Sequence, residues 1–168
     1  VTAEGEVITL SLAKDGEHFN GVVVGLGAVG VVTKVTLDVI PAFDMRQYLY
    51  FDLPLTQLED HFEDIFTSAY SVSLFTDWKD ENFNQVWLKQ RVSDGEALSP
   101  DSTFYGGTPA DRDYHPIAAL SAEPCTKQMG VVGAWYERLP HFRMNFTPSS
   151  GEELQTEYFV AREHAFDA

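Results

Sequence analysis

The segment from Val31 to Ile40 constrains the fold of this chain more than any other. Its residues alternate with a period of two, and one face carries only apolar or β-branched side chains: Val31, Thr33, Val35, Leu37 and Val39. Such alternation is typical of a strand with one buried face. Pro41 ends the run, because proline has no backbone N–H to donate to a sheet. We therefore predict a half-buried strand over residues 31–40.

The six residues before this run match a nucleotide-binding motif by letter. Gly25-Leu26-Gly27-Ala28-Val29-Gly30 has the spacing G-x-G-x-x-G. In the dinucleotide-binding fold the motif opens a helix, whose N-terminal amides bind the pyrophosphate. Here β-branched residues follow it, and these disfavour a helix. The pattern argues against a Rossmann turn and leaves two alternatives: a purely structural glycine turn, or a turn that lets a ligand approach the backbone.

The first 24 residues hold one further strand candidate. The β-branched and apolar run over residues 7–12 favours a strand, entered through a hairpin turn at Glu4-Gly5. Residues 14–20 are polar, and Asp15-Gly16 is typical of a turn.

A change of character after Pro41 predicts two domains, residues 1–41 and residues 42–168. The second begins with a long strand candidate over residues 45–53. Residues 70–78 and 85–92 are two more strands, which we expect to form a hairpin with one solvated face.

Between these strands the sequence predicts an amphipathic helix over residues 57–68. Thr56 and Glu59 have the spacing of a capping box, in which each side chain bonds the other residue's amide. Apolar residues follow at helical spacing: Leu58, Phe62, Ile65 and Phe66.

The remainder has less periodicity. Residues 93–139 are rich in proline and glycine and are expected to form a long, irregular loop. Residues 141–146 and 154–160 resume strand character, with a turn at residues 148–151, and residues 162–165 resemble the start of a helix. The predicted architecture is α+β, truncated at both ends.

Charge limits the classes of partner. The chain has 11 Lys and Arg against 26 Asp and Glu, a net charge of −15. Such a field repels nucleic acid and anionic lipid surfaces. The longest apolar stretch is too short to span a bilayer, and no secretory signal is visible at the start. One cysteine cannot form an internal disulfide, which fits a cytoplasmic protein.

The titratable residues give no strong catalytic or metal site. The five histidines lack the spacing of a helical metal site. His141, between two arginines, either faces an anionic group such as a pyrophosphate or serves simple packing or surface hydrogen bonding. Cys125 has no supporting nucleophile motif, and Glu59-Asp60 with Glu63-Asp64 is typical of a solvated helix face. We expect four aromatic residues to pack in the core and at its edges rather than form a substrate platform: Phe75, Trp78, Trp87 and Trp135.

Longer segments resemble a known family. The stretch from Gly25 to Thr33, followed by Leu37-Asp38, is similar to the last segment of the flavin domain in vanillyl-alcohol-oxidase-type flavoproteins. Four downstream segments resemble the alditol oxidase and xylitol oxidase branch, which is related to D-arabinono-1,4-lactone oxidases: residues 69–78, 85–89, 137–143 and 146–155.

The resemblance implies an internal fragment of an FAD-dependent oxidase. Residues 1–41 would be the C-terminal part of an FAD-binding (PCMH-type) domain, and residues 42–168 the N-terminal part of a mixed-sheet substrate (cap) domain. The implied reaction oxidises the terminal hydroxyl of a polyol, such as xylitol or sorbitol, to an aldose while O2 is reduced to H2O2.

Carried over residue by residue, the resemblance leaves one cofactor contact. Gly27 and Gly30 would let FAD approach the backbone of Val31 and Val32. The family's Gly-Ser-Gly-His-Ser motif, whose histidine bonds FAD covalently, does not occur here. Its catalytic residues lie outside the matching segments, so we expect no catalytic residue, no metal site, no bound FAD and no turnover in this chain alone.

A non-catalytic binding module that retains the cap fold without flavin is the alternative. In either case the strands predicted over residues 7–40 would lack partners, so we expect copies of this piece to pair as a homodimer.

Overall fold

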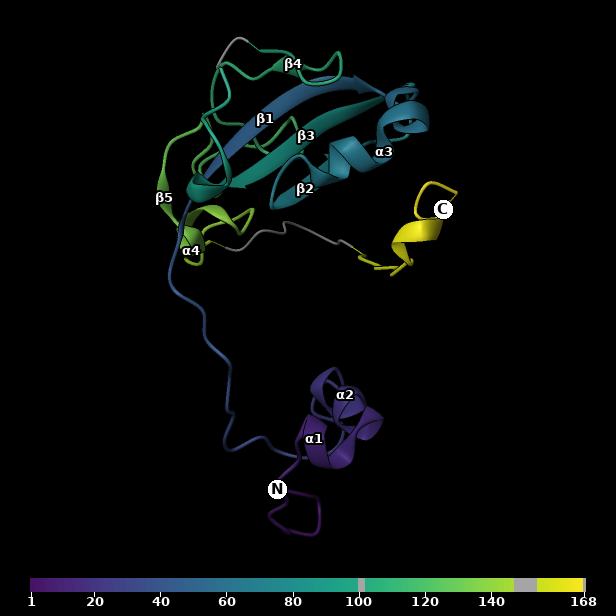
Figure 1. Cartoon of the computed structure of the whole chain (residues 1–168), viewed down its shortest axis with the longest axis vertical. Coiled ribbons are helices and arrows are strands. Elements are labelled where there is room, and N and C mark those ends of the chain that lie inside the picture. Colours follow the sequence, from purple (N-terminus) through teal and green to yellow (C-terminus); the bar gives the residue numbers. More distant parts are fainter. Residues whose placement is uncertain (100–101, 147–153, 168) are drawn as a thin grey trace. The chain divides into compact units, whose positions relative to one another are not determined.

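The computed structural model describes residues 1–99, 102–146 and 154–167, which form two compact units (Figure 1). The units are Val1–Pro41 and Ala42–Ala168. Within the described residues no helix has both the length and the apolar character that a membrane crossing requires. The chain is a mixed α/β structure with an antiparallel sheet, which confirms that helices and strands combine as expected.

The sheet of the second unit is organised around one long strand, β1 (Asp44–Pro54). One edge of β1 pairs with β3 (Asn82–Arg91) from Met45 opposite Arg91 to Pro54 opposite Asn82. Beyond β3 lies β2 (Ser71–Phe75), its hairpin partner. The other edge of β1 pairs with two short strands, β4 (Thr108–Pro109) and β5 (Gly133–Ala134). The strands predicted over residues 45–53, 70–78 and 85–92 are therefore confirmed.

One face of this sheet is covered by the helix α3 (Gln57–Thr67). Ile65 of α3 is fully buried and packs with Tyr48 and Tyr50 of β1 and with Val86 and Leu88 of β3. The amphipathic pattern thus predicts the helix and its buried face correctly. The capping box is wrong, because the Thr56 side chain makes no capping hydrogen bond and Thr56 itself is helical.

The other face of the sheet is covered by the irregular segment over residues 110–142. Between η1 (Val92–Asp94) and this segment the described residues form only the short strand β4, and the segment itself contains only β5 and α4 (Trp135–Arg138). Leu98, Phe104 and Tyr105 pack on the α3 side of the sheet instead. Leu49 and Trp87 of the sheet pack with Ala110 and Cys125 of the irregular segment. The expectation of a solvated hairpin face is therefore wrong for β3, whose central residues are buried on both sides.

The first unit differs most from expectation. Residues 7–10 and 31–40 form no strand, and two short helices, α1 (Leu12–Asp15) and α2 (Glu17–Val23), occupy the stretch expected to be polar turn. A strand needs a neighbour to bond its N–H and C=O groups. Within this unit no second strand is available, and none of its 41 residues is buried. The turn at Gly5 is confirmed, with its amide donating to the Thr2 carbonyl at 3.0 Å.

The last part of the chain is also less regular than predicted. The strand expected over residues 141–146 is reduced to one bridge between Phe142 and Cys125. Residues 154–160 form no strand with any of the described residues, and the expected helix start is a 3-10 turn, η2 (Arg162–His164). The turn predicted over residues 148–151 lies outside the described residues.

Replacing Ile65 by alanine tests the packing of α3 on the sheet. Ile65 is fully buried, so Ile65→Ala should lower the free energy of unfolding by about 2–5 kcal/mol. Ile117→Ala removes the same atoms at a site that is 56% exposed, and it should cost less than about 1 kcal/mol. Urea denaturation followed by circular dichroism measures both. Equal losses in the two variants would contradict this packing.

Candidate functional site

The glycine turn predicted to face a cofactor is formed by residues 25–30. The Ala28 amide donates to the Gly25 carbonyl at 2.9 Å, and the Gly30 amide donates to the Gly27 carbonyl at 3.1 Å. Gly27 and Gly30 have φ angles of +81° and +138°, which L side chains rarely adopt. No helix follows this turn, as argued against a Rossmann motif.

The two glycines serve different purposes. A Cβ added at Gly27 would meet nothing within 4 Å, so the backbone there is open to an approaching group. A Cβ at Gly30 would collide with the carbonyl of Val1. Gly30 is therefore required by packing within the unit, whereas Gly27 leaves its surface free.

The two valines after the turn differ in their backbone hydrogen bonds. Val31 donates to the Val1 carbonyl at 2.9 Å and accepts from the Val1 amino group at 2.8 Å. Val32 makes no backbone hydrogen bond to the described residues. Both side chains are about two-thirds exposed (69% and 68%). Of the four residues predicted to contact the cofactor, only Val32 has both its amide and its carbonyl free of hydrogen bonds to the described residues.

The second unit contains a buried polar layer that the sequence did not indicate. It lies between the sheet and residues 110–142. Lys89 of β3 is fully buried, and its Nζ donates to the carbonyls of Arg138 and Pro140 at 2.8 and 2.9 Å. Gln85 donates to the His115 carbonyl at 2.9 Å. Strand side chains thus bond the backbone of a segment that has no ladder of its own.

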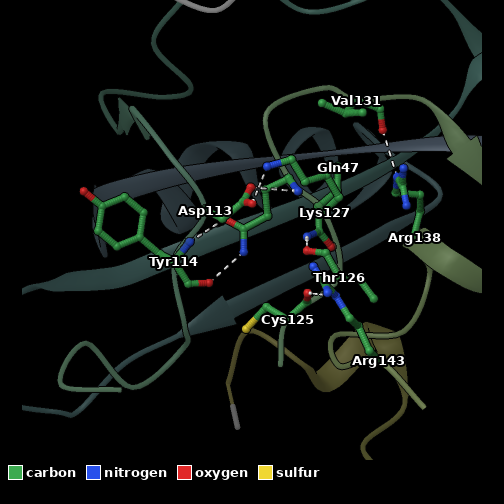
Figure 2. A network of polar contacts seen from close by, with 10 residues as sticks. Gln47, Asp113, Tyr114, Cys125, Thr126, Lys127, Val131, Arg138 and Arg143 are labelled. Atoms are coloured by element: carbon green, nitrogen blue, oxygen red, sulfur yellow. Dashed lines mark hydrogen bonds and ion pairs between the residues drawn. The ribbon is translucent and has the colours of Figure 1, made fainter. Parts of the chain in front are cut away.

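Side chains of the irregular segment extend this layer toward the surface, where Lys127 and Arg143 are exposed (Figure 2). Asp113 pairs with Lys127 at 2.6 Å and accepts from the Gln128 amide at 3.1 Å. Gln128 is fully buried. Its side-chain Nε2 donates to the Tyr114 carbonyl at 2.7 Å, and its Oε1 accepts from the Tyr114 backbone amide at 2.9 Å. Arg143 donates to the Cys125 carbonyl at 3.0 Å. These bonds fix loops that are far apart in sequence.

His141 packs against aromatic rings rather than facing an anion. Its ring stacks on Trp87 at 5.1 Å between centroids and meets the edge of Phe75 at 5.6 Å. Burial, together with the neighbouring charge of Lys89, lowers the pKa of His141 to about 4. A neutral imidazole attracts anions weakly, so the packing alternative holds.

Cys125 is buried and unreactive in this structure. Burial, with the nearby Asp113, raises the pKa of its thiol to about 11, and a protonated thiol is a poor nucleophile. Among the described residues no group of three or more His, Cys, Asp or Glu is placed to hold a metal ion.

The four aromatic residues expected to pack behave differently from one another. Trp87 is fully buried and Phe75 contacts it edge-on. Trp135 is 41% exposed and stacks on Phe43. Trp78 is 83% exposed with a φ of +58°, so the expectation of packing is wrong for it. It lies in the β2–β3 connection, where the chain must reverse.

Comparison with known proteins shows which protein this sequence resembles. No protein-family model matches the chain. The chain is 51% identical over all of its 168 residues to the alditol oxidase of a Streptomyces species. The chain is therefore alditol oxidase-like. The resemblance to the alditol oxidase branch, stated from the sequence, is confirmed.

This alditol oxidase-like chain spans 38% of the length of that relative. The buried layer around Lys89 therefore lies within the part of that relative's sequence that this chain matches. No local signal marks Lys89, because a lysine in a strand normally indicates a solvated face. Only the length of the flanking loop suggested that something covers the sheet.

The buried Lys89 predicts a pH-dependent stability. Burial lowers its pKa to about 7, whereas in the unfolded chain it keeps its proton up to about pH 10.4. Between these values the unfolded state binds more protons, so stability rises with pH. The free energy of unfolding of the wild type minus that of Lys89→Met should therefore rise by up to about 1.4 kcal/mol per pH unit between about pH 7.5 and 9.

Urea denaturation at several pH values measures this difference. Subtracting the variant removes the titration of Cys125, which both proteins share. Lys34→Met, at an exposed position, is the matched control and should give a difference that does not change with pH. A flat difference for Lys89→Met would show that Lys89 titrates normally.

Proposed function

We propose that this chain is part of a flavin-dependent oxidase that converts the terminal hydroxyl of a polyol, such as xylitol or sorbitol, to an aldose while O2 is reduced to H2O2. The observation that carries the proposal is the 51% identity to an alditol oxidase along the whole chain. The polyol and O2 would be the partners. The net charge of −15 is consistent with a cytoplasmic protein that binds neither nucleic acid nor membrane.

In this proposal the two units belong to different domains. Val1–Pro41 would be the C-terminal part of the FAD-binding (PCMH-type) domain, and Ala42–Ala168 the N-terminal part of the substrate (cap) domain. The division of the chain into two compact units between Pro41 and Ala42 supports this assignment. The exposed apolar side chains of the first unit are consistent with a surface that another segment of a longer protein covers, or with a surface through which two copies of this piece pair.

Two of the four residues predicted to contact flavin, Gly27 and Val32, have a backbone that fits such a contact. When bound, FAD supplies the redox chemistry, accepting a hydride from the carbinol carbon and passing electrons to O2. Gly27 would leave room for the cofactor, and the unpaired backbone of Val32 would bond to it. Gly30 and Val31 would hold the turn through Val1 instead. We propose no catalytic residue among residues 1–168.

Assay of a longer protein that carries this segment tests the proposed reaction. We expect yellow protein with flavin absorbance in the visible range and peroxide production from xylitol or sorbitol. The 168 residues alone should give neither, because the resemblance places the flavin attachment and the catalytic groups elsewhere. A colourless, flavin-free longer protein would instead favour the non-catalytic binding module, and peroxide from the 168 residues alone would place catalytic groups within them.

Two matched glycine substitutions test the turn itself. Gly27→Ala and Gly5→Ala both place a side chain at a φ near +80° with nothing within 4 Å, so each should cost about 1–2 kcal/mol of backbone strain. In the longer protein, only Gly27→Ala should lower the ratio of flavin to protein, by several-fold. Absorbance gives the ratio, and thermal unfolding checks that both variants lose similar stability. Equal flavin content in the two variants would show that the turn does not contact the cofactor.

A further inference from the structure

The four sulfur-containing side chains of this chain differ widely in their exposure to solvent. The sequence has three methionines and one cysteine, and all four lie within the described residues. Met45 is 0% exposed, Cys125 1%, Met129 37% and Met144 94%. A dissolved oxidant must reach the sulfur atom itself, so this order is also the order in which the four side chains are open to oxidation.

Met144 lies on a turn whose backbone is fixed while its side chain stays in solvent. The Phe146 amide donates to the Arg143 carbonyl at 3.1 Å and closes the turn. Arg143 anchors it, because its amide donates to the Pro124 carbonyl at 2.8 Å and its side-chain Nε donates to the Cys125 carbonyl at 3.0 Å. Met144 belongs to neither hydrophobic cluster of the described residues. Its thioether is therefore presented to water by an ordered segment.

The other three sulfur atoms are shielded to different degrees. Met45 is fully buried in β1, which is paired along both edges at this point. Cys125 is buried as well, and burial raises the pKa of its thiol to about 11. Peroxide reacts with the thiolate and hardly at all with the thiol, so Cys125 is protected twice. Met129 is partly exposed and lines a cavity beside Leu98.

We propose that Met144 is the site at which hydrogen peroxide first modifies this chain. The sulfur lone pair forms a bond to one peroxide oxygen, the O–O bond breaks, and the proton on the transferred oxygen passes to the departing hydroxide. Methionine sulfoxide and water result, with the sulfur losing the two electrons that the peroxide gains. The source of the peroxide rests on the proposed function, in which O2 is reduced to H2O2, whereas the exposure of Met144 does not.

Oxidation at Met144 should leave the fold intact. Sulfoxide formation turns an apolar side chain into a polar one, which disrupts a core but not a side chain that is already in water. At Met129 the same change would place a polar oxygen at the apolar wall of a cavity. Modification of Met144 alone should therefore leave the urea midpoint of the chain unchanged.

Oxidation of the folded 168-residue chain by added hydrogen peroxide tests the site. Trypsin cleaves after Lys and Arg, and it places the four sulfur atoms in four separate peptides: residues 35–46, 113–127, 128–138 and 144–162. Mass spectrometry of samples quenched at intervals gives a rate for each. We expect Met144 to be oxidised several-fold faster than Met129 and at least about tenfold faster than Met45. Equal or faster oxidation of either of these would overturn the proposal.

Two controls show whether the fold sets this order. In concentrated guanidinium chloride the three methionines should be oxidised at similar rates, because unfolding exposes them all. Met144→Leu keeps an apolar side chain of similar volume without the sulfur. It should remove the fastest oxidation and leave the rates of Met45 and Met129 within about twofold of the wild type. Persistence of the same order in denaturant would contradict an origin in exposure.

In the longer protein, turnover of xylitol should supply the peroxide itself. We expect Met144 sulfoxide to accumulate during turnover and added catalase to prevent it. Absence of peroxide would count against the proposed function, and added peroxide would then decide whether Met144 is still the first site. Peroxide production that leaves Met144 unmodified, while another sulfur is oxidised, would overturn the present proposal and leave the proposed function intact.

Discussion

The second unit depends on hydrogen bonds between strand side chains and an irregular segment. Residues 110–142 cover one face of the sheet, yet they have almost no regular structure to pair their own N–H and C=O groups. Buried backbone groups without partners cost several kcal/mol in total, so the covering segment needs donors and acceptors from elsewhere. Lys89 and Gln85 of β3, together with Gln128 of the segment itself, provide them. A more apolar sheet face would leave this cover unbonded.

Local patterns in the sequence predict those elements that local interactions stabilise. The helix α3 was predicted because its apolar periodicity matches the face that it buries. The strands β1, β2 and β3 were also predicted, although β1 and β3 are buried on both faces. The alternation over residues 31–40 is at least as regular, yet no strand forms there. Periodicity reports which face an extended segment can bury, but a strand also needs a neighbour, and the first unit contains none. The capping box failed because Thr56, the residue before the helix, has helical backbone angles and its side chain makes no capping hydrogen bond.

The candidate sites divide in the same way. A glycine turn is visible from sequence, because positive φ angles demand glycine at Gly27 and Gly30. That Val31 is already bonded to Val1 is not visible, because thirty positions separate the two residues. Lys89 was missed for the same reason, because its acceptors, the carbonyls of Arg138 and Pro140, come from a distant part of the chain. A polar residue in a strand indicates solvent unless the fold provides a cover.

The central position of β1 has a consequence for how this chain is made. One edge of β1 is completed by β3, which follows it closely, but the other waits for β4 and for Gly133 to pair with Met45. During synthesis that edge stays open while most of the second unit is still emerging. Pairings across such sequence separations give a high contact order and slow folding. An open strand edge is also where nascent chains associate wrongly, so the irregular cover protects the sheet only at the end of its own synthesis.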